Sequence, residues 1–218
     1  MTEEPRTPVL TLDGVVKRVG KRVAIRGLSH DFYAGDLVYI LGGGSQPKQL
    51  LTRIIAGQLL PDQGHVLRNG PPGPMPGGGM GFQMVMSALR GLEMRAAAFG
   101  VDYRDYVDRI SALMRNPEVL RKPFKSIQGV DRNMLLFGSA YLLPATHYVS
   151  DNAPMSSEPM AKRRVGPIYE AARERAAIIV IPKRDPSPTA MGDAKVLYFN
   201  NGVLSEVPPE KPEKKRPK

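Results

Sequence analysis

The chain has 218 residues, of which 42% are hydrophobic and 24% are charged, and this composition is ordinary for a globular protein with a packed core. It has no cysteine, which excludes disulfides and thiolate metal sites, and no apolar run reaches the ~18 residues that span a bilayer. The net charge is +10, but no aromatic residues alternate with the basic ones, so no nucleic acid is expected as a partner.

The first part of the chain predicts strands that lead into a glycine-rich loop and a helix. Apolar and polar residues alternate in short runs, a pattern typical of strands. After the glycines, apolar residues recur with a helical period, because Leu50, Leu51 and Ile54 share one face. The expected strands cover residues 9–12, 23–28 and 37–41, and the expected helix covers residues 49–59.

The remainder mixes helices and strands after a segment rich in glycine and proline. Residues 70–81 cannot form the interior of a helix or strand, because proline lacks a donor and glycine costs entropy, so we expect a flexible insert or hinge. The order of the elements predicts an α/β fold with a parallel core sheet. Helices are expected over residues 84–99, 103–115, 133–143 and 168–175, and strands over 146–151 and 177–181, before a hairpin that turns at 200–202.

The glycine loop partly matches the phosphate-binding pattern G-x-x-x-x-G-K-[ST]. In such loops backbone N–H groups curl around phosphates, a lysine reaches the terminal phosphates and a hydroxyl ligates Mg²⁺. Gly42 and Lys48 fit the pattern, but Pro47 replaces the second glycine and Gln49 replaces the hydroxyl residue. On the motif alone, a glycine turn before a helix, with Lys48 a solvated residue of the first helical turn, is favoured over a phosphate site.

The sequence around this loop resembles the ATP-binding cassette subunit of ABC transporters. The resemblance is carried by "YILGGGSQPKQLLTRIIAG", by "PDQGHVLRNG" after it and by "LDGVVKRVGKRVAIRG" before it. Downstream, "ALRGLEMRAAAFGVDYRDY" is similar to the helical subdomain of the family. Its R-G-x-E and F-G-V-D residue patterns resemble those of the branch that exports capsular polysaccharides and polyol phosphates. Together these segments extend the resemblance over nearly the whole chain, about residues 9–204.

The resemblance implies a P-loop NTPase-like ABC cassette with a parallel core sheet, an antiparallel β subdomain and a helical subdomain. We expect this fold over residues 1–206, with the helical subdomain at about 84–143 and a basic, disordered tail over 207–218. The implied partners are a membrane permease subunit and a second cassette subunit, identical or different. The first ten residues lack the features of a secretory signal, and we expect a cytoplasmic chain, peripheral on the inner face of the cell membrane, with no transmembrane segment of its own.

Most positions that carry chemistry in the family are altered in this chain. Asp151 keeps the Mg²⁺-associated carboxylate, but Asn152 replaces the glutamate that polarises water, and an amide cannot accept that proton. Lys183, or the neighbouring Pro182, stands at the switch-histidine position. The resemblance places the nucleotide contacts at Gly42, Gly43, Gly44, Ser45, Lys48 and Gln49.

The remaining family positions are matched only in part. Ser126 and Gly129 lie in "KSIQGVDRN" and match parts of the signature motif that caps the partner's γ-phosphate. Gln83 is the candidate for the glutamine that senses Mg²⁺ and the membrane subunit. Val19 stands where an aromatic ring would stack on adenine, and valine cannot stack as a ring does.

These changes predict that binding of the implied cofactors, ATP and Mg²⁺, is weak or lost. The chain is then a degenerate subunit of a polysaccharide-type ABC exporter, catalytically inactive alone, that pairs with a similar or intact ATPase. One alternative is a pseudo-ATPase scaffold or interaction protein that has kept the cassette fold without transport. Another is an active ATPase with unusual residues, since phosphoryl transfer depends on positioning by several groups together.

Overall fold

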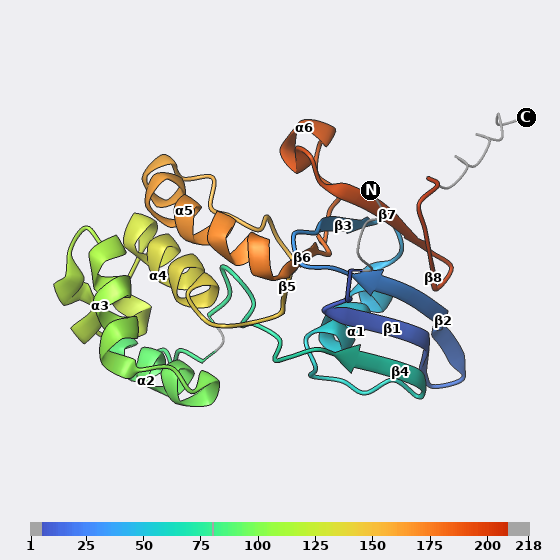
Figure 1. The fold of residues 1–218 in the computed structure, drawn as a ribbon, viewed down its shortest axis with the longest axis horizontal. Helices are drawn as coiled ribbons and strands as arrows, with labels where there is room; N and C mark the ends of the chain where they lie inside the picture. The colour runs from blue at the N-terminus through green and yellow to red at the C-terminus, as the bar shows by residue number, and fades with distance from the viewer. Residues whose placement is uncertain (1–5, 80, 209–218) are drawn as a thin grey trace, which may run out of the picture.

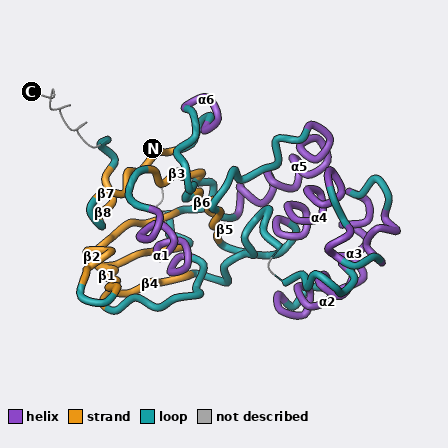
Figure 2. Tube along the Cα trace, turned by 180° about the vertical axis from the view of Figure 1, so that it is seen from behind, coloured by secondary structure: helices purple, strands orange, loops and turns teal. Residues whose placement is uncertain are grey.

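The computed structural model describes residues 6–79 and 81–208. Two β-sheets and the helix α1 form one side of the molecule, and the helices α2 to α5 gather on the other (Figures 1 and 2). The larger sheet has the strand order β5-β6-β3-β7-β8, in which the first four strands are parallel and β8 is antiparallel. Its strands are β3 (Leu37–Leu41), β5 (His147–Ser150), β6 (Ala177–Val180), β7 (Lys195–Asn200) and β8 (Val203–Ser205).

Three of the four parallel strands are buried on both faces, as the crossover helices of such sheets require. Every residue of β3, β5 and β6 is buried. Alternate side chains point to opposite faces, so Tyr39 and Ile178 belong to the core shared with α4 and α5, while Ile40 and Ile179 pack against α1 and the smaller sheet. The sheet therefore lies between two apolar layers.

The smaller sheet is antiparallel, with the order β2-β1-β4. Its first two strands form one long hairpin that continues to Gly20, well beyond the expected end at residue 12. The sheet buries one face on α1, through residues such as Leu10, Ile25 and Ile54. Its strands are β1 (Leu10–Val19), β2 (Arg22–Phe32) and β4 (Gln63–Arg68).

The helical side contains most of the expected helices, with shifted boundaries. Helix α2 begins at Ala88 rather than residue 84, because the Ser87 side chain caps it by accepting from the N–H of Arg90. Helix α5 is much longer than expected, since Glu158 caps its start by accepting from the N–H of Ala161. The helices are α1 (Ser45–Ile55), α2 (Ala88–Phe99), α3 (Tyr103–Leu113), α4 (Gly129–Tyr141), α5 (Pro159–Arg175) and α6 (Pro188–Met191), with 3₁₀ turns at Pro117–Arg121 and Phe124–Ser126.

Several glycines of the 70–81 segment permit close packing. Pro72 pairs with His147 at the edge of β5, and the N–H of Gly73 donates to the carbonyl of His147. A Cβ on Gly73 would lie 2.2 Å from the ring of Tyr148, and one on Gly77 would lie 2.8 Å from the ring of Phe137. Glycine therefore lets this backbone pass between the sheet and α4, which composition alone does not indicate.

His147 lies in β5 and is fully buried. Its Nε2 is 3.1 Å from the carbonyl oxygen of Ile55, so this nitrogen carries the proton and donates. Burial, with a smaller contribution from the charge of Arg68, lowers the pKa of His147 to about 4. The side chain is neutral and joins the sheet to the end of α1.

The last hairpin is confirmed, and the tail beyond it is described only in part. Strands β7 and β8 join through Asn201 and Gly202, which have φ of 49° and 86°, as a tight hairpin turn requires. The expected basic tail lies outside the described residues from position 209 onward. Among the described residues, no helix combines the length and apolarity needed to span a bilayer.

Candidate functional site

The glycine loop joins the end of β3 to the start of α1. Gly42 and Gly43 have φ of 74° and 67°, a region in which a side chain is strained. The helix begins at Ser45 rather than at residue 49, since the N–H of Lys48 already donates to the carbonyl of Gly44. Pro47 therefore lies in the first turn of α1, where its missing N–H leaves no helical bond unmade. The irregular loop is limited to three glycines, shorter than the phosphate-binding pattern predicts.

Lys48 is buried and held by groups of its own chain. Only 5% of the residue is exposed, and its Nζ donates to the carbonyl oxygen of Pro182 at 2.6 Å. The same Nζ lies 3.6 Å from Oδ1 of Asp185. The solvated alternative for Lys48 is therefore wrong. Its role as a phosphate ligand stays a prediction, and any phosphate at this lysine must share it with Asp185.

Asp185 is the site residue that sequence reasoning missed. Both of its carboxylate oxygens lie 3.3 Å from the N–H of Gly42, so the residue contacts the glycine loop as well as Lys48. The signal in the sequence was an aspartate two residues after Lys183, in "PKRDP". Proline on both sides of a charged run after a strand is typical of a loop with a defined turn conformation.

Asp151 and Lys183 lie beside each other and form an ion pair. Asp151 follows the end of β5, and its Oδ2 lies 2.6 Å from Nζ of Lys183. Its Oδ1 accepts from the side-chain amide of Asn152 at 3.0 Å. The hydrogen bond and charge of Asp151 raise the pKa of Lys183, which stays an ammonium. A cation thus pairs with the carboxylate that the resemblance assigns to Mg²⁺.

A pocket of about 430 Å³ lies beside these residues, and most of its ionisable side chains are basic. Its ionisable lining consists of three basic side chains and one acid, Asp151. At nucleotide sites Mg²⁺ is held by one or two protein oxygens together with phosphates and water, and Asp151 is the one carboxylate among the lining residues. The lining residues are Ser45, Lys48, Gln49, Thr52, Arg53, Met75, Asp151, Ile181 and Lys183.

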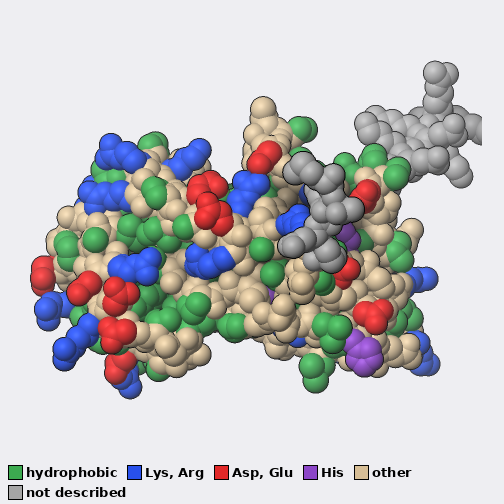
Figure 3. Space-filling model, viewed as in Figure 1, with side chains coloured by type: hydrophobic (Ala, Val, Ile, Leu, Met, Phe, Trp, Pro, Cys, Tyr) green, Lys and Arg blue, Asp and Glu red, His purple; other side chains and the backbone are tan. Residues whose placement is uncertain are grey.

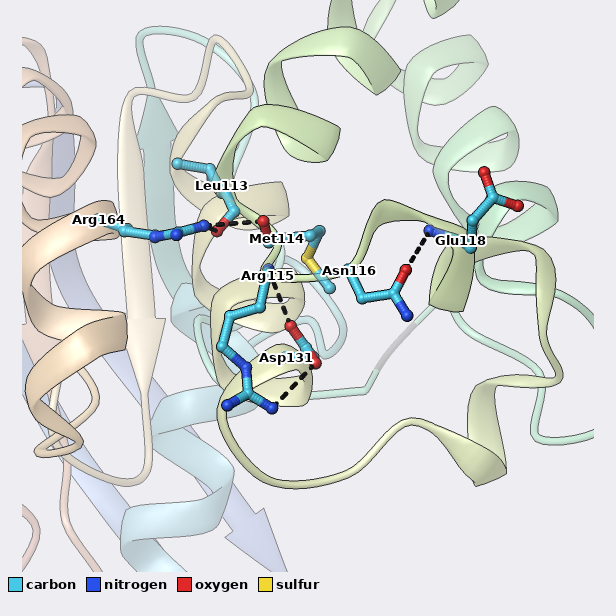
Figure 4. Close-up of polar contacts among 7 residues, drawn as sticks. All are labelled: Leu113, Met114, Arg115, Asn116, Glu118, Asp131 and Arg164. Atoms are coloured by element: carbon cyan, nitrogen blue, oxygen red, sulfur yellow. Dashed lines mark hydrogen bonds and ion pairs between the residues drawn. The ribbon is translucent and has the colours of Figure 1, made fainter.

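The signature-like segment begins α4, and its polar groups are used within the chain. Gly129 is the first residue of α4, and the hydroxyl of Ser126 donates to the carbonyl of Pro123 at 2.7 Å. Asp131 lies in the first helical turn, accepts from the N–H of Arg115 at 3.1 Å and lies 3.8 Å from its guanidinium (Figure 4). An acid at this helix end opposes the binding of another anion there.

Arg164 of α5 fixes the same region from the other side. Its Nη1 donates to the carbonyls of Leu113 and Met114 at the end of α3, at 2.8 and 2.7 Å (Figure 4). These two carbonyls lie at a helix end, where they have no partner within the helix. The helices α3, α4 and α5 are therefore tied together around the start of α4.

The remaining predicted positions lie away from the loop. Gln83 is exposed and lines none of the pockets at the loop, where Met75 is found instead. Val19 is exposed at the end of β1. A second pocket of about 170 Å³ borders Gly43 and Gly44, and β2 contributes Arg22 and Arg26 to it. The structure thus places basic residues beside the loop and does not bring Val19 to it.

The surface carries its positive charge unevenly. Lysine and arginine side chains gather near α5 on the helical side, whereas acidic and basic side chains alternate lower on that side (Figure 3). Lys162 and Arg163 are exposed on α5, while Arg164 is half-buried.

Comparison with known proteins agrees with the fold. No family model matches the chain. A solved ATP-binding subunit of an ABC transporter superposes with a TM-score of 0.72 at 16% identity, covering 90% of this chain and 88% of that one. The cbiO1 protein of Clostridium perfringens, part of the ABC transporter complex cbiONQ, has a TM-score of 0.66 at 15% identity, covering 91% and 87%.

Sequence similarity extends to several curated ATP-binding proteins. The fructose import protein FrcA of Rhizobium meliloti is 32% identical over 65 residues, which are 30% of this chain and only 25% of that protein. The energy-coupling factor transporter protein EcfA1 of Mycoplasma pneumoniae is 22% identical, covering 89% of this chain and 76% of that protein. The polysialic acid transport protein KpsT of Escherichia coli is 21% identical, covering 92% and 87%.

The fold and the sequence similarity agree on one class of protein. The parallel sheet, the antiparallel sheet and the separate helical side occur here in the arrangement expected from the sequence. The chain therefore has the fold of the ABC transporter ATPase cassette and is similar in sequence to the ATP-binding proteins of these transporters.

Proposed function

We propose that the chain is a degenerate nucleotide-binding subunit of an ABC exporter, inactive as an ATPase on its own. One observation carries this proposal. The two charged residues retained from the phosphate and metal motifs, Lys48 and Asp151, each pair with a protein group of opposite charge, Asp185 and Lys183. Both charges that would meet a magnesium nucleotide are already compensated.

The chemistry of phosphoryl transfer supports the inactive state. The reaction depends on positioning and charge stabilisation by several groups acting together. In this chain Asn152 cannot serve as a general base, and Gln49 offers no compact hydroxyl at the Mg²⁺ position. Each such group is typically worth about 10²- to 10⁴-fold in rate, so their joint loss removes most of the acceleration.

The proposed transport role is export of a polysaccharide or polyol phosphate. Support comes from the R-G-x-E and F-G-V-D residue patterns and from the similarity to KpsT, a polysialic acid transport protein, over 92% of this chain. The other relatives named above are an import protein and an energy-coupling factor protein, so the substrate class rests on these two observations. The chain would dock on a membrane permease from the cytoplasmic side, beside a second cassette.

A second candidate function is that of a scaffold that keeps the fold without transport, and the signature-like segment favours it. The Ser126 hydroxyl is bonded within its own turn, and Asp131 places an acid at the start of α4. A partner's bound phosphate would then gain little from this segment. In a pair of cassettes, this chain would weaken the partner's site as well as its own.

The first experiment measures phosphate release and ATP binding with the full chain, with and without Mg²⁺, for the wild type and Lys48→Ala. We expect no release above a buffer blank in either protein. Turnover by the wild type that Lys48→Ala abolishes would overturn the proposal and support an active ATPase with unusual residues.

The second experiment separates the transporter subunit from the scaffold. The tagged chain is purified from detergent-solubilised membranes, and its partners are identified by mass spectrometry. Recovery with a permease and a second cassette supports the exporter subunit. Recovery of a stoichiometric complex that contains no permease supports the scaffold.

A further inference from the structure

The carboxylate of Asp185 lies against the two groups of the glycine loop that would bind an anion. The N–H of Gly42 lies 3.3 Å from each carboxylate oxygen, and the ammonium of Lys48 lies 3.6 Å from one of them. Backbone N–H groups of a turn with positive-φ glycines can form an anion-binding concavity, and a lysine adds a full charge. The chain itself thus supplies a negative group at the phosphate-binding elements.

We infer that Asp185 is a resident anion of the glycine loop, a binding-site residue that occupies the loop in place of a ligand phosphate. The inference concerns the same site as the proposed function. It rests on that function only in naming phosphate as the group that Asp185 replaces. Its geometric basis is independent of transport, because it needs only the loop, the lysine and the carboxylate.

The segment that carries Asp185 is anchored before the carboxylate. Strand β6 ends at Val180, and the next N–H, that of Ile181, donates to the carbonyl of Ser150 on β5. Pro182 is buried, and its carbonyl accepts from Nζ of Lys48 at 2.6 Å. Lys48 therefore contacts the segment through a backbone oxygen as well as a carboxylate.

The ion pair between Lys48 and Asp185 is only partly shielded from water. The Lys48 side chain is 7% exposed, but the Asp185 side chain is 49% exposed, so water reaches the carboxylate and weakens the ion pair. An incoming phosphate carries more charge than one carboxylate and can accept from the same donors. It must nevertheless displace Asp185, and this requirement lowers its affinity.

The test removes the charge of Asp185 and measures anion binding directly. Inorganic pyrophosphate and Mg²⁺-free ATP are titrated by calorimetry into wild type, Asp185→Asn and Asp185→Ser. We expect both variants to bind at least one of these anions about 10- to 100-fold more tightly than the wild type, the range of one charge-assisted contact. A further change, Lys48→Ala, should remove the gain.

A matched control is available in Asp193. It is exposed and ion-paired with Arg173 at 2.8 Å, and it lines none of the pockets at the loop. Asp193→Asn removes the same charge, so it reports the effect of net charge alone. Equal affinities for Asp185→Asn and Asp193→Asn would overturn the inference.

Thermal unfolding provides a second measurement, which does not depend on any ligand. Asp185→Asn should lower the melting temperature more than Asp193→Asn, because the buried Lys48 ammonium then keeps only a carbonyl partner. Equal melting temperatures for the two variants would count against the resident anion.

The outcomes also separate this inference from the proposed function. Turnover of ATP by the wild type would overturn the proposed function, while a tighter affinity in Asp185→Asn would still support the resident anion. Absence of turnover with no gain in either Asp185 variant would leave the proposed function standing and overturn the inference.

Discussion

Strand β6 and the loop that follows it differ sharply within ten residues, because the strand is apolar and the loop is charged. All four residues of β6 are buried and apolar, whereas Lys183, Arg184 and Asp185 in the loop are exposed and charged. The strand lies between two apolar layers, so its residues are determined by packing. The exposed charged residues of the loop lie outside the core and contact the candidate site. If the proposed function is correct, the packed strands have kept the architecture of the cassette while the catalytic positions were replaced.

The strand side of this comparison is tested by Ile179→Ala. Ile179 is fully buried in the layer that faces α1, and the substitution leaves a cavity. We expect a loss of about 2–5 kcal/mol in the free energy of unfolding, measured by urea denaturation. A loss below about 1 kcal/mol would show that this layer is loosely packed, and the contrast with the loop would fail.

The buried His147 of strand β5 tests the comparison through the pH dependence of the free energy of unfolding. The pKa of His147 is lowered from about 6.5 to about 4, so the folded state stays neutral while the unfolded state takes up a proton. Stability should be complete above pH 6.5 and fall by about 3 kcal/mol as the pH drops to 4. Urea denaturation across this range measures the slope, and His147→Gln should flatten it. An equal slope in both proteins would contradict the assignment.

The helical side has a comparable anchor in Arg164, and α5 offers a matched control beside it. Arg164→Ala removes two charge-assisted bonds to the end of α3 and should cost about 1–3 kcal/mol in the free energy of unfolding. Arg163→Ala, on the exposed face of the same helix, should leave the free energy of unfolding nearly unchanged. Similar losses in both variants would mean that the anchor contributes nothing specific.

The smallest effect is expected at the ion pair between Lys183 of the loop and Asp151. Lys183 and Asp151 form a short ion pair, but the Lys183 side chain is 64% exposed and its charge is screened. Lys183→Ala should leave the melting temperature unchanged within the scatter of replicate scans. A clear drop would show that this loop contributes to the stability of the fold as well as to its chemistry.

The sequence predicted the architecture well because its main signals are local. The period of Leu50 and Ile54 indicated α1, and the turn at residues 200–202 indicated the last hairpin, both of which the structure confirms. The boundaries were less accurate, since the capping bonds of Ser87 and Glu158 depend on geometry that a residue pattern does not show.

The site was less predictable because its pairs are distant along the chain. Lys48 and Asp185 are 137 positions apart, and nothing in either segment indicates that the other is its partner. Motif matching assigned a role to Lys48 from its neighbours in sequence. Its actual environment depends on β3 and β6 lying side by side, which brings the loops at their carboxyl ends together.

The glycine-rich segment at residues 70–81 has a mechanical consequence. Gly73 fits against Tyr148 of the sheet and Gly77 against Phe137 of α4, with no space for a further carbon at either point. The segment is thus fixed to a ring of the sheet at one point and to a ring of α4 four residues later. A rotation of the helical side against the sheet would have to rearrange both of these contacts.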